Sequence, residues 1–177
     1  GTCYAGCYTP TQRVAFNGEY SPVPKAAESR RPTVTALARG SQQSSLRFGE
    51  QPIRAFVRGD TGEMEEDVFL LETSDGGRLE VTSEHPMVTD QGAIVRAKSL
   101  RVGDKILRSN GNTATLSRVT VSPFKGTVWN VQPVSHNKTE NILDAEGFLT
   151  GSIRFQNEWA SDNYRLSLRD DVDVSGF

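Results

Sequence analysis

Short runs of alternating apolar and polar residues, separated by turn residues, occupy most of the chain. The clearest two runs span residues 68–73 and 78–82 and flank an Asp-Gly turn at residues 74–77, a pattern that predicts a β-hairpin. Further strands are predicted at residues 12–16, 52–58, 93–96, 105–108, 114–121 and 127–133. No stretch keeps a 3.6-residue apolar period long enough for a core helix, and residues 97–100 are expected to form one helical turn. The pattern predicts an all-β fold that curls on itself, because a long meander must protect its edges.

Two stretches lack this alternation. Residues 21–45 are rich in Pro, Ser, Ala and Arg, and they predict a long connection around one strand at residues 33–38. Residues 152–177 are polar and predict a flanking segment or an extra strand, whose acidic run at 170–173 is a solvated tail. The length of 177 residues fits one domain, which we place at residues 7–151, with residues 1–6 and 152–177 flanking it.

Composition narrows the class of protein. Hydrophobic residues make up 36% and charged residues 24%, which is typical of a folded globular chain. The net charge of −2 argues against a nucleic-acid binder, because phosphate neutralisation needs an excess of Lys and Arg. No apolar run approaches the length of a membrane span. The two cysteines, Cys3 and Cys7, lack the paired histidines of a zinc motif, so neither a metal nor a cofactor is expected.

Several short motifs follow one another in a fixed order along the chain. They are Cys7-Tyr-Thr-Pro-Thr-Gln-Arg-Val14 with Asn17-Gly18, Thr82-Ser-Glu-His85 with Pro86, Asp90-Gln-Gly92, Leu100-Arg-Val-Gly-Asp104, Val128-Trp-Asn-Val131 and Ile142-Leu-Asp-Ala-Glu-Gly147. In this order they resemble the Hint domains shared by inteins, bacterial intein-like domains and hedgehog autoprocessing domains, and the match runs from Cys7 to about Gly151. The resemblance implies a flattened horseshoe of curled strands with a pseudo-two-fold repeat. It also implies that the domain acts on its own flanking polypeptide.

The chemistry of these residues is coherent without the family name. The thiol of Cys7 can attack the carbonyl of Gly6 and convert the Gly6–Cys7 amide into a thioester. Expelling the amine needs a proton, which histidine can supply near neutral pH. The resemblance assigns this step to His85, with Thr82 beside it. Because these two residues lie on opposite faces of a regular strand, a turn or bulge at residues 83–84 is needed to bring both to one site.

The chain departs from the splicing pattern at its C-terminal end. Inteins end in His-Asn, but the expected place holds Thr150-Gly151. The nearest asparagine is Asn157, which is followed by Glu158, a residue that cannot accept an acyl group. We therefore expect a thioester that is resolved by water or another nucleophile, as in hedgehog-type processing, rather than full splicing. Asn157 is the candidate for separate C-terminal cleavage.

Alternatives remain open at this point. The chain could be a non-catalytic β-rich module that keeps the fold, or a cysteine hydrolase that acts on other molecules, although no substrate-pocket signature supports the latter. Outside the motifs, Asp104 is expected to form a turn and His136 to lie in a solvated loop, while Phe124, Trp129 and Phe148 are expected in the core. Cys3 has either no role or a redox role, in which a disulfide to Cys7 blocks the thiol until it is reduced.

Overall fold

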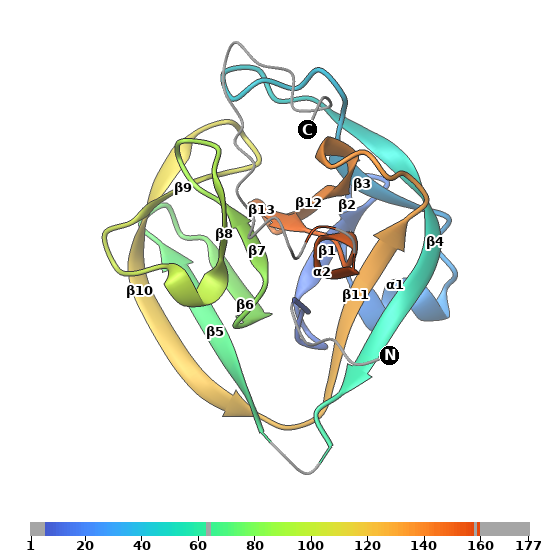
Figure 1. Ribbon diagram of the computed structural model, residues 1–177, viewed down its shortest axis with the longest axis horizontal. Helices are drawn as coiled ribbons and strands as arrows, with labels where there is room; N and C mark the ends of the chain where they lie inside the picture. Colours follow the sequence, from blue (N-terminus) through green and yellow to red (C-terminus); the bar gives the residue numbers. More distant parts are fainter. Residues whose placement is uncertain (1–5, 63–64, 158, 160–177) are drawn as a thin grey trace.

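The computed structural model describes residues 6–62, 65–157 and 159. Strands form most of this part of the chain (Figure 1). They are β1 (Arg13–Phe16), β2 (Glu19–Pro22), β3 (Thr33–Leu37), β4 (Phe48–Asp60), β5 (Glu66–Thr73), β6 (Arg78–Thr82), β7 (Pro86–Val88), β8 (Ile94–Arg96), β9 (Lys105–Leu107), β10 (Thr113–Phe124), β11 (Thr127–Pro133), β12 (Ile142–Ala145) and β13 (Phe148–Gly151). The helices are short: α1 (Val23–Glu28), α2 (Arg154–Asn157) and the 3-10 turns η1 (Ala97–Ser99) and η2 (Thr139–Asn141). The predicted all-β fold with little helix is confirmed.

In the ranges that the structure describes, all strand pairs are antiparallel, and they form three sheets. One sheet has the order β11-β4-β3-β12-β13-β7-β8, the second has the order β6-β5-β10-β9, and β1 pairs with β2 alone. The long pairs β4–β11 and β5–β10 lie on opposite sides of the molecule, and the chain crosses between them at one end (Figure 1). This arrangement is the curled horseshoe with two related halves that the sequence motifs imply.

The hairpin of β5 and β6 is confirmed with the predicted turn, and its register pairs Val68 with Thr82. The hairpin of β1 and β2 turns at Asn17-Gly18, where both residues have positive φ, as this tight turn requires. Within residues 21–45 the predicted strand is confirmed as β3, but the connection before it is not irregular, because the end of β2 and α1 lie there. α1 has only six residues and buries only Val23 and Ala26, which is too short a pattern to reveal a helical period.

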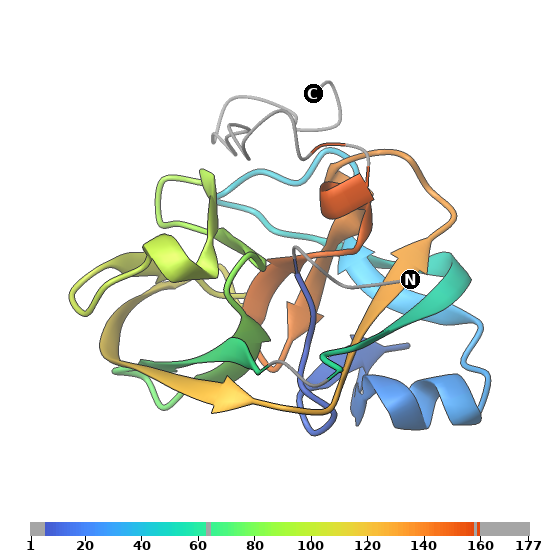
Figure 2. The same ribbon diagram turned by 60° about the horizontal axis from the view of Figure 1, so that its bottom comes forward.

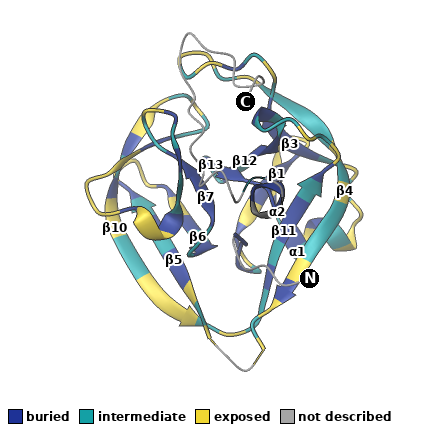
Figure 3. Cartoon of the chain, viewed as in Figure 1, coloured by how far each residue is buried: buried dark blue, intermediate teal, exposed yellow. Residues whose placement is uncertain are grey.

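The core lies between the two halves of the horseshoe, as the dark blue inner faces in Figure 3 show. One large cluster of buried side chains contains Phe16, Leu71, Val131 and Phe148. A second cluster includes Phe155, which is 1% exposed, so the chain beyond β13 packs against the domain. No helix in the described ranges is long and apolar enough to cross a membrane.

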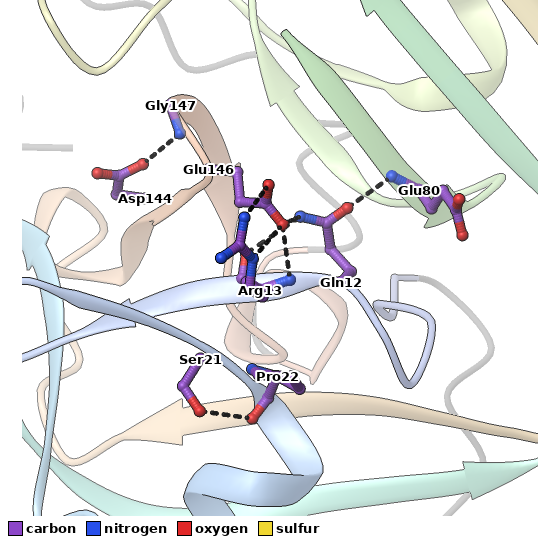
Figure 4. A network of polar contacts seen from close by, with 8 residues as sticks. All are labelled: Gln12, Arg13, Ser21, Pro22, Glu80, Asp144, Glu146 and Gly147. Carbon is purple, nitrogen blue, oxygen red and sulfur yellow. Dashed lines mark hydrogen bonds and ion pairs between the residues drawn. The ribbon is translucent and has the colours of Figure 1, made fainter.

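A polar network fixes the start of β1 (Figure 4). The carboxylate of Glu146, in the turn between β12 and β13, accepts hydrogen bonds from Gln12 Nε2 and from the backbone N–H of Arg13, each at 3.2 Å. The side-chain oxygen of Gln12 accepts a hydrogen bond from the backbone N–H of Glu80 in β6 at 2.8 Å. Because Gln12 is buried, these bonds hold the N-terminal segment against both halves of the fold.

Candidate functional site

The segment that precedes β1 runs through the middle of the molecule, between β6 and β11 (Figures 1 and 2). Tyr8 forms bridges to Trp129 on one side and to Val81 on the other. Its backbone N–H donates to the Trp129 carbonyl at 2.7 Å, and its carbonyl accepts from the Trp129 N–H at 2.9 Å. Cys7 and Tyr8 are completely buried. The Gly6–Cys7 peptide bond therefore lies in the interior, pinned by both halves of the fold.

Thr82 holds Cys7 through two hydrogen bonds. The backbone N–H of Cys7 donates to Thr82 Oγ1 at 2.9 Å, and the backbone N–H of Thr82 donates to the Cys7 carbonyl at 2.9 Å. After Thr82 the strand breaks into a turn, in which the N–H of His85 donates to the Thr82 carbonyl at 3.2 Å. This turn occupies residues 83–84, where the strand geometry required one, and it lets Thr82 and His85 reach the same peptide bond.

His85 packs directly against Gly6. A Cβ added to Gly6 would lie 3.1 Å from His85 Cα, 3.1 Å from Pro86 Cδ and 3.5 Å from His85 Nδ1. The ring of Tyr8 covers the imidazole, with the two ring centroids 4.4 Å apart. The structure thus brings Gly6, Cys7, Thr82 and His85 together.

The environment of His85 keeps its ring neutral. The side chain is fully buried, and loss of hydration lowers its pKa from 6.5 to about 3. Backbone groups of Cys7 and Gly151 beside the ring oppose this shift only in part. In the described part of the chain neither ring nitrogen has a hydrogen bond of normal geometry, which agrees with burial as the dominant cause. At neutral pH the ring is therefore neutral, and it must first take up a proton before it can donate one.

Asn130 on β11 is a site residue that the sequence analysis missed. Its side-chain amide Nδ2 donates a hydrogen bond to the carbonyl oxygen of Gly6, and its Oδ1 accepts from the backbone N–H of Val131 at 2.7 Å. Asn130 is completely buried. The sequence did contain one sign of this role, because Asn130 is an amide at an inward-facing position of an apolar strand. A buried amide normally needs a specific hydrogen-bond partner.

The sulfur of Cys7 is oxidised: the residue is disulfide-bonded, and the described part of the chain contains no free cysteine. The sequence has one other cysteine, Cys3, which lies outside the described residues. A thiol at Cys7 is therefore generated only by reduction.

The end of β13 also reaches the site. Thr150 Oγ1 shares a hydrogen bond of 2.8 Å with the Tyr8 hydroxyl. Gly151 has no room for a side chain, because a Cβ there would lie 2.8 Å from both Pro86 and Phe155. Ser152 Oγ donates to Asn141 Oδ1 at 2.6 Å, and its backbone N–H donates to the Asn141 carbonyl at 2.9 Å. Asn157 ends α2, and Glu158 lies outside the described residues.

The other residues named from the sequence lie away from the Gly6–Cys7 bond or outside the described residues. Asp104 caps a turn by accepting a hydrogen bond from the Arg101 N–H at 2.8 Å. His136 is exposed in a loop, where its Nδ1 lies 3.3 Å from the Arg154 guanidinium. Phe148 is fully buried, whereas Phe124 and Trp129 pack at the edges of core clusters. The acidic run at 170–173 lies outside the described residues.

No family model and no curated protein sequence matches this chain. Solved structures do match. The chain is similar to a DnaB intein from Synechocystis sp. PCC 6803, with a TM-score of 0.64 and 12% identity over 84% of this chain and 99% of that chain. It is also similar to a bacterial intein-like domain from Clostridium thermocellum, with a TM-score of 0.60 and 14% identity over 82% of this chain and 98% of that one. An intein from a hyperthermophile gives a TM-score of 0.60 and 13% identity over 84% of this chain and 100% of that chain. The architecture is thus the Hint fold that the motifs predicted.

Proposed function

We propose that this chain is a self-processing domain whose substrate is its own Gly6–Cys7 peptide bond. The observation that carries the proposal is that Thr82 binds the N–H of this bond while His85 packs against Gly6. Thr82 Oγ1 accepts the hydrogen bond of the scissile N–H at 2.9 Å, and the His85 ring lies against Gly6 with no other polar partner of normal geometry among the described residues. A buried imidazole without a well-formed hydrogen bond is costly to keep, and this cost is understandable if the ring serves a reaction.

The reaction begins with reduction of the Cys7 disulfide by a thiol reductant, which becomes oxidised and leaves a free Cys7 thiol. Neutral His85 takes the thiol proton, and the thiolate attacks the Gly6 carbonyl carbon. The new S–C bond forms, the C–N bond breaks, and His85 returns the proton to the departing Cys7 amine. The product is a thioester between Gly6 and the Cys7 side chain, which water or another nucleophile cleaves.

The C-terminal side favours cleavage without splicing. Splicing in inteins uses a side-chain amide at the last residue, and Gly151 stands at that place with Pro86 and Phe155 filling the space of a side chain. The Ser152 hydroxyl is held by Asn141. Release at the upstream junction, with the downstream sequence left attached, is therefore the outcome that we propose.

Mass spectrometry of the chain with dithiothreitol, with and without hydroxylamine, tests the proposal. We expect loss of residues 1–6, with a hydroxamate on Gly6 when hydroxylamine is present. The Cys7→Ala variant should stay intact, and His85→Ala should react about 10²–10⁴-fold more slowly, the usual contribution of general acid–base catalysis. His136→Ala is the matched control, because His136 is exposed in a loop, and it should react at the parental rate.

Two further measurements separate the alternatives. Parent protein mixed with the Cys7→Ala variant should not cleave it, whereas a hydrolase that acts on other molecules would. A product that ends at Asn157 would show C-terminal cleavage there. If reducing conditions give no new mass at the Gly6–Cys7 junction, the chain is a non-catalytic module that retains the fold.

A further inference from the structure

We infer that Asn130 is a catalytic residue that stabilises the oxyanion formed on Gly6 when the Gly6–Cys7 bond is attacked. This inference rests on the proposed function, since it assigns a role within the same reaction. The sequence motifs place Asn130 in Val128-Trp-Asn-Val131 but assign it no part in the chemistry. Its contact with the carbonyl oxygen of the bond to be broken is what assigns it one.

The two polar atoms of the scissile peptide are bound from opposite halves of the fold. Thr82, on β6, accepts from the N–H of Cys7 at 2.9 Å, whereas Asn130, on β11, donates to the carbonyl oxygen of Gly6. A donor on this oxygen withdraws electron density from the carbonyl carbon and makes it more open to attack. When the sulfur–carbon bond forms, the carbonyl π electrons move onto the oxygen, and the donor then faces a full negative charge.

The orientation of the Asn130 amide is fixed before the reaction. The backbone N–H of Val131 donates to Asn130 Oδ1 at 2.7 Å, and an N–H can only face an oxygen. This bond leaves the NH₂ group pointing at Gly6. Because Asn130 is completely buried, no water competes for its donor, and hydrogen bonds to a developing charge are strongest in such surroundings. A preorganised donor in a dry site is the requirement for oxyanion stabilisation.

Asn130 differs from a purely structural buried amide in its partner. A structural amide would satisfy its donor on a carbonyl of the scaffold, as Asn141 does with the carbonyls of Ser135 and Asn137. Asn130 instead donates to the residue that leaves with the upstream segment. When the segment that ends at Gly6 is released, the Asn130 amide loses its acceptor. A hydrogen bond that stabilised the folded domain would be kept after cleavage, whereas one that serves the reaction is needed only until the bond is broken.

The Asn130→Asp variant is the direct test. It keeps the shape and the acceptor for the Val131 N–H, but it replaces the donor with an oxygen that repels the developing charge. Under reducing conditions, at saturating dithiothreitol, we expect the first-order rate of cleavage at Gly6–Cys7 to fall about 10²–10³-fold or more, the usual effect of losing an oxyanion donor. Asn130→Ala, which introduces no charge, should lose about 10²-fold or more. Asn112→Asp, an exposed turn substitution, is the control and should react at the parental rate.

A second measurement does not depend on activity. Gly6–Cys7 is the only Gly-Cys pair in the sequence, so ¹³C-carbonyl glycine with ¹⁵N-cysteine labels this one peptide bond. In the oxidised, unreactive protein, the Gly6 carbonyl resonance should move upfield in Asn130→Asp and Asn130→Ala, because the hydrogen bond to the oxygen is lost, and it should not move in Asn112→Asp.

The results distinguish the two proposals. A parent that cleaves together with Asn130 variants that cleave at the same rate would overturn the role of Asn130 and leave the proposed function standing. An unchanged Gly6 resonance in a folded Asn130 variant would also overturn that role, whether or not the parent cleaves. A parent that never cleaves would overturn the proposed function, and with it any catalytic role for Asn130.

Discussion

Burial of His85 predicts a specific loss of stability in mild acid. The ring titrates at pH 6.5 when hydrated, but its pKa in the folded chain is about 3 because it is removed from water. Between these values the unfolded chain binds a proton that the folded chain does not, so the free energy of unfolding falls as the pH falls. With these two pKa values, His85 alone lowers the free energy of unfolding by about 2 kcal/mol at pH 5 and by almost nothing at pH 8.

Urea unfolding of the oxidised protein at pH 8 and pH 5 measures this effect, with His85→Gln as the variant that cannot titrate. Other groups also respond to pH. Asp144, for example, has a pKa raised by burial, so folded chains bind its proton more readily and gain stability in acid. Such effects are common to parent and variant, and they cancel when the two are subtracted.

We expect the parent to lose about 2 kcal/mol more than His85→Gln between pH 8 and pH 5, and His136→Gln to behave like the parent. Equal losses in the parent and in His85→Gln would refute the reasoning, because they would show that the folded chain protonates His85 as easily as the unfolded chain. The ring would then be hydrated in the folded chain, and the inference that burial lowers its pKa would fail.

Three other predictions concern the Gly6–Cys7 junction and the residues on either side of the domain. Gly6→Val should slow cleavage more than Gly6→Ala, because the first added carbon already lies 3.1 Å from the backbone of His85; equal single-turnover rates for parent and variants would contradict this. Under oxidising conditions Cys3→Ser should cleave at Gly6–Cys7, whereas the parent should stay intact because its Cys7 is held in a disulfide. The mass of the oxidised parent should be two daltons lower than that of its reduced form. A parent without that mass difference would rule out control of cleavage by this disulfide. Phe155→Ala should lower the free energy of unfolding by about 3–5 kcal/mol in a urea titration, because the ring is 1% exposed; a change below about 1 kcal/mol would show that residues after Gly151 do not belong to the folded domain.

The alternation of apolar and polar residues determined most of the fold. The hairpin at residues 68–82 and the strand at 127–133 could be read from local pattern, because a strand with one buried face must alternate and an Asp-Gly turn fixes where it reverses. The motif order also pointed to the Hint fold at a sequence identity too low for any sequence match. The short elements α1 and β7 were not predicted, because they contain too few residues to show a helical or strand period of apolar positions.

From the sequence, Cys7, Thr82 and His85 could be predicted as candidate site residues. A turn between Thr82 and His85 could also be predicted, because a regular strand would put these two residues on opposite faces. The sequence could not place Asn130 on the Gly6 carbonyl, since 124 positions separate the two residues and an inward amide on a strand has no local mark of its partner. The lowered pKa of His85 could not be predicted from the sequence either, because it depends on the exclusion of water by Tyr8 and the surrounding strands. Those features arise only when the two halves of the horseshoe close on the N-terminal segment, because hydrogen-bond partners and dehydration are properties of the packed interior and not of any one stretch of chain.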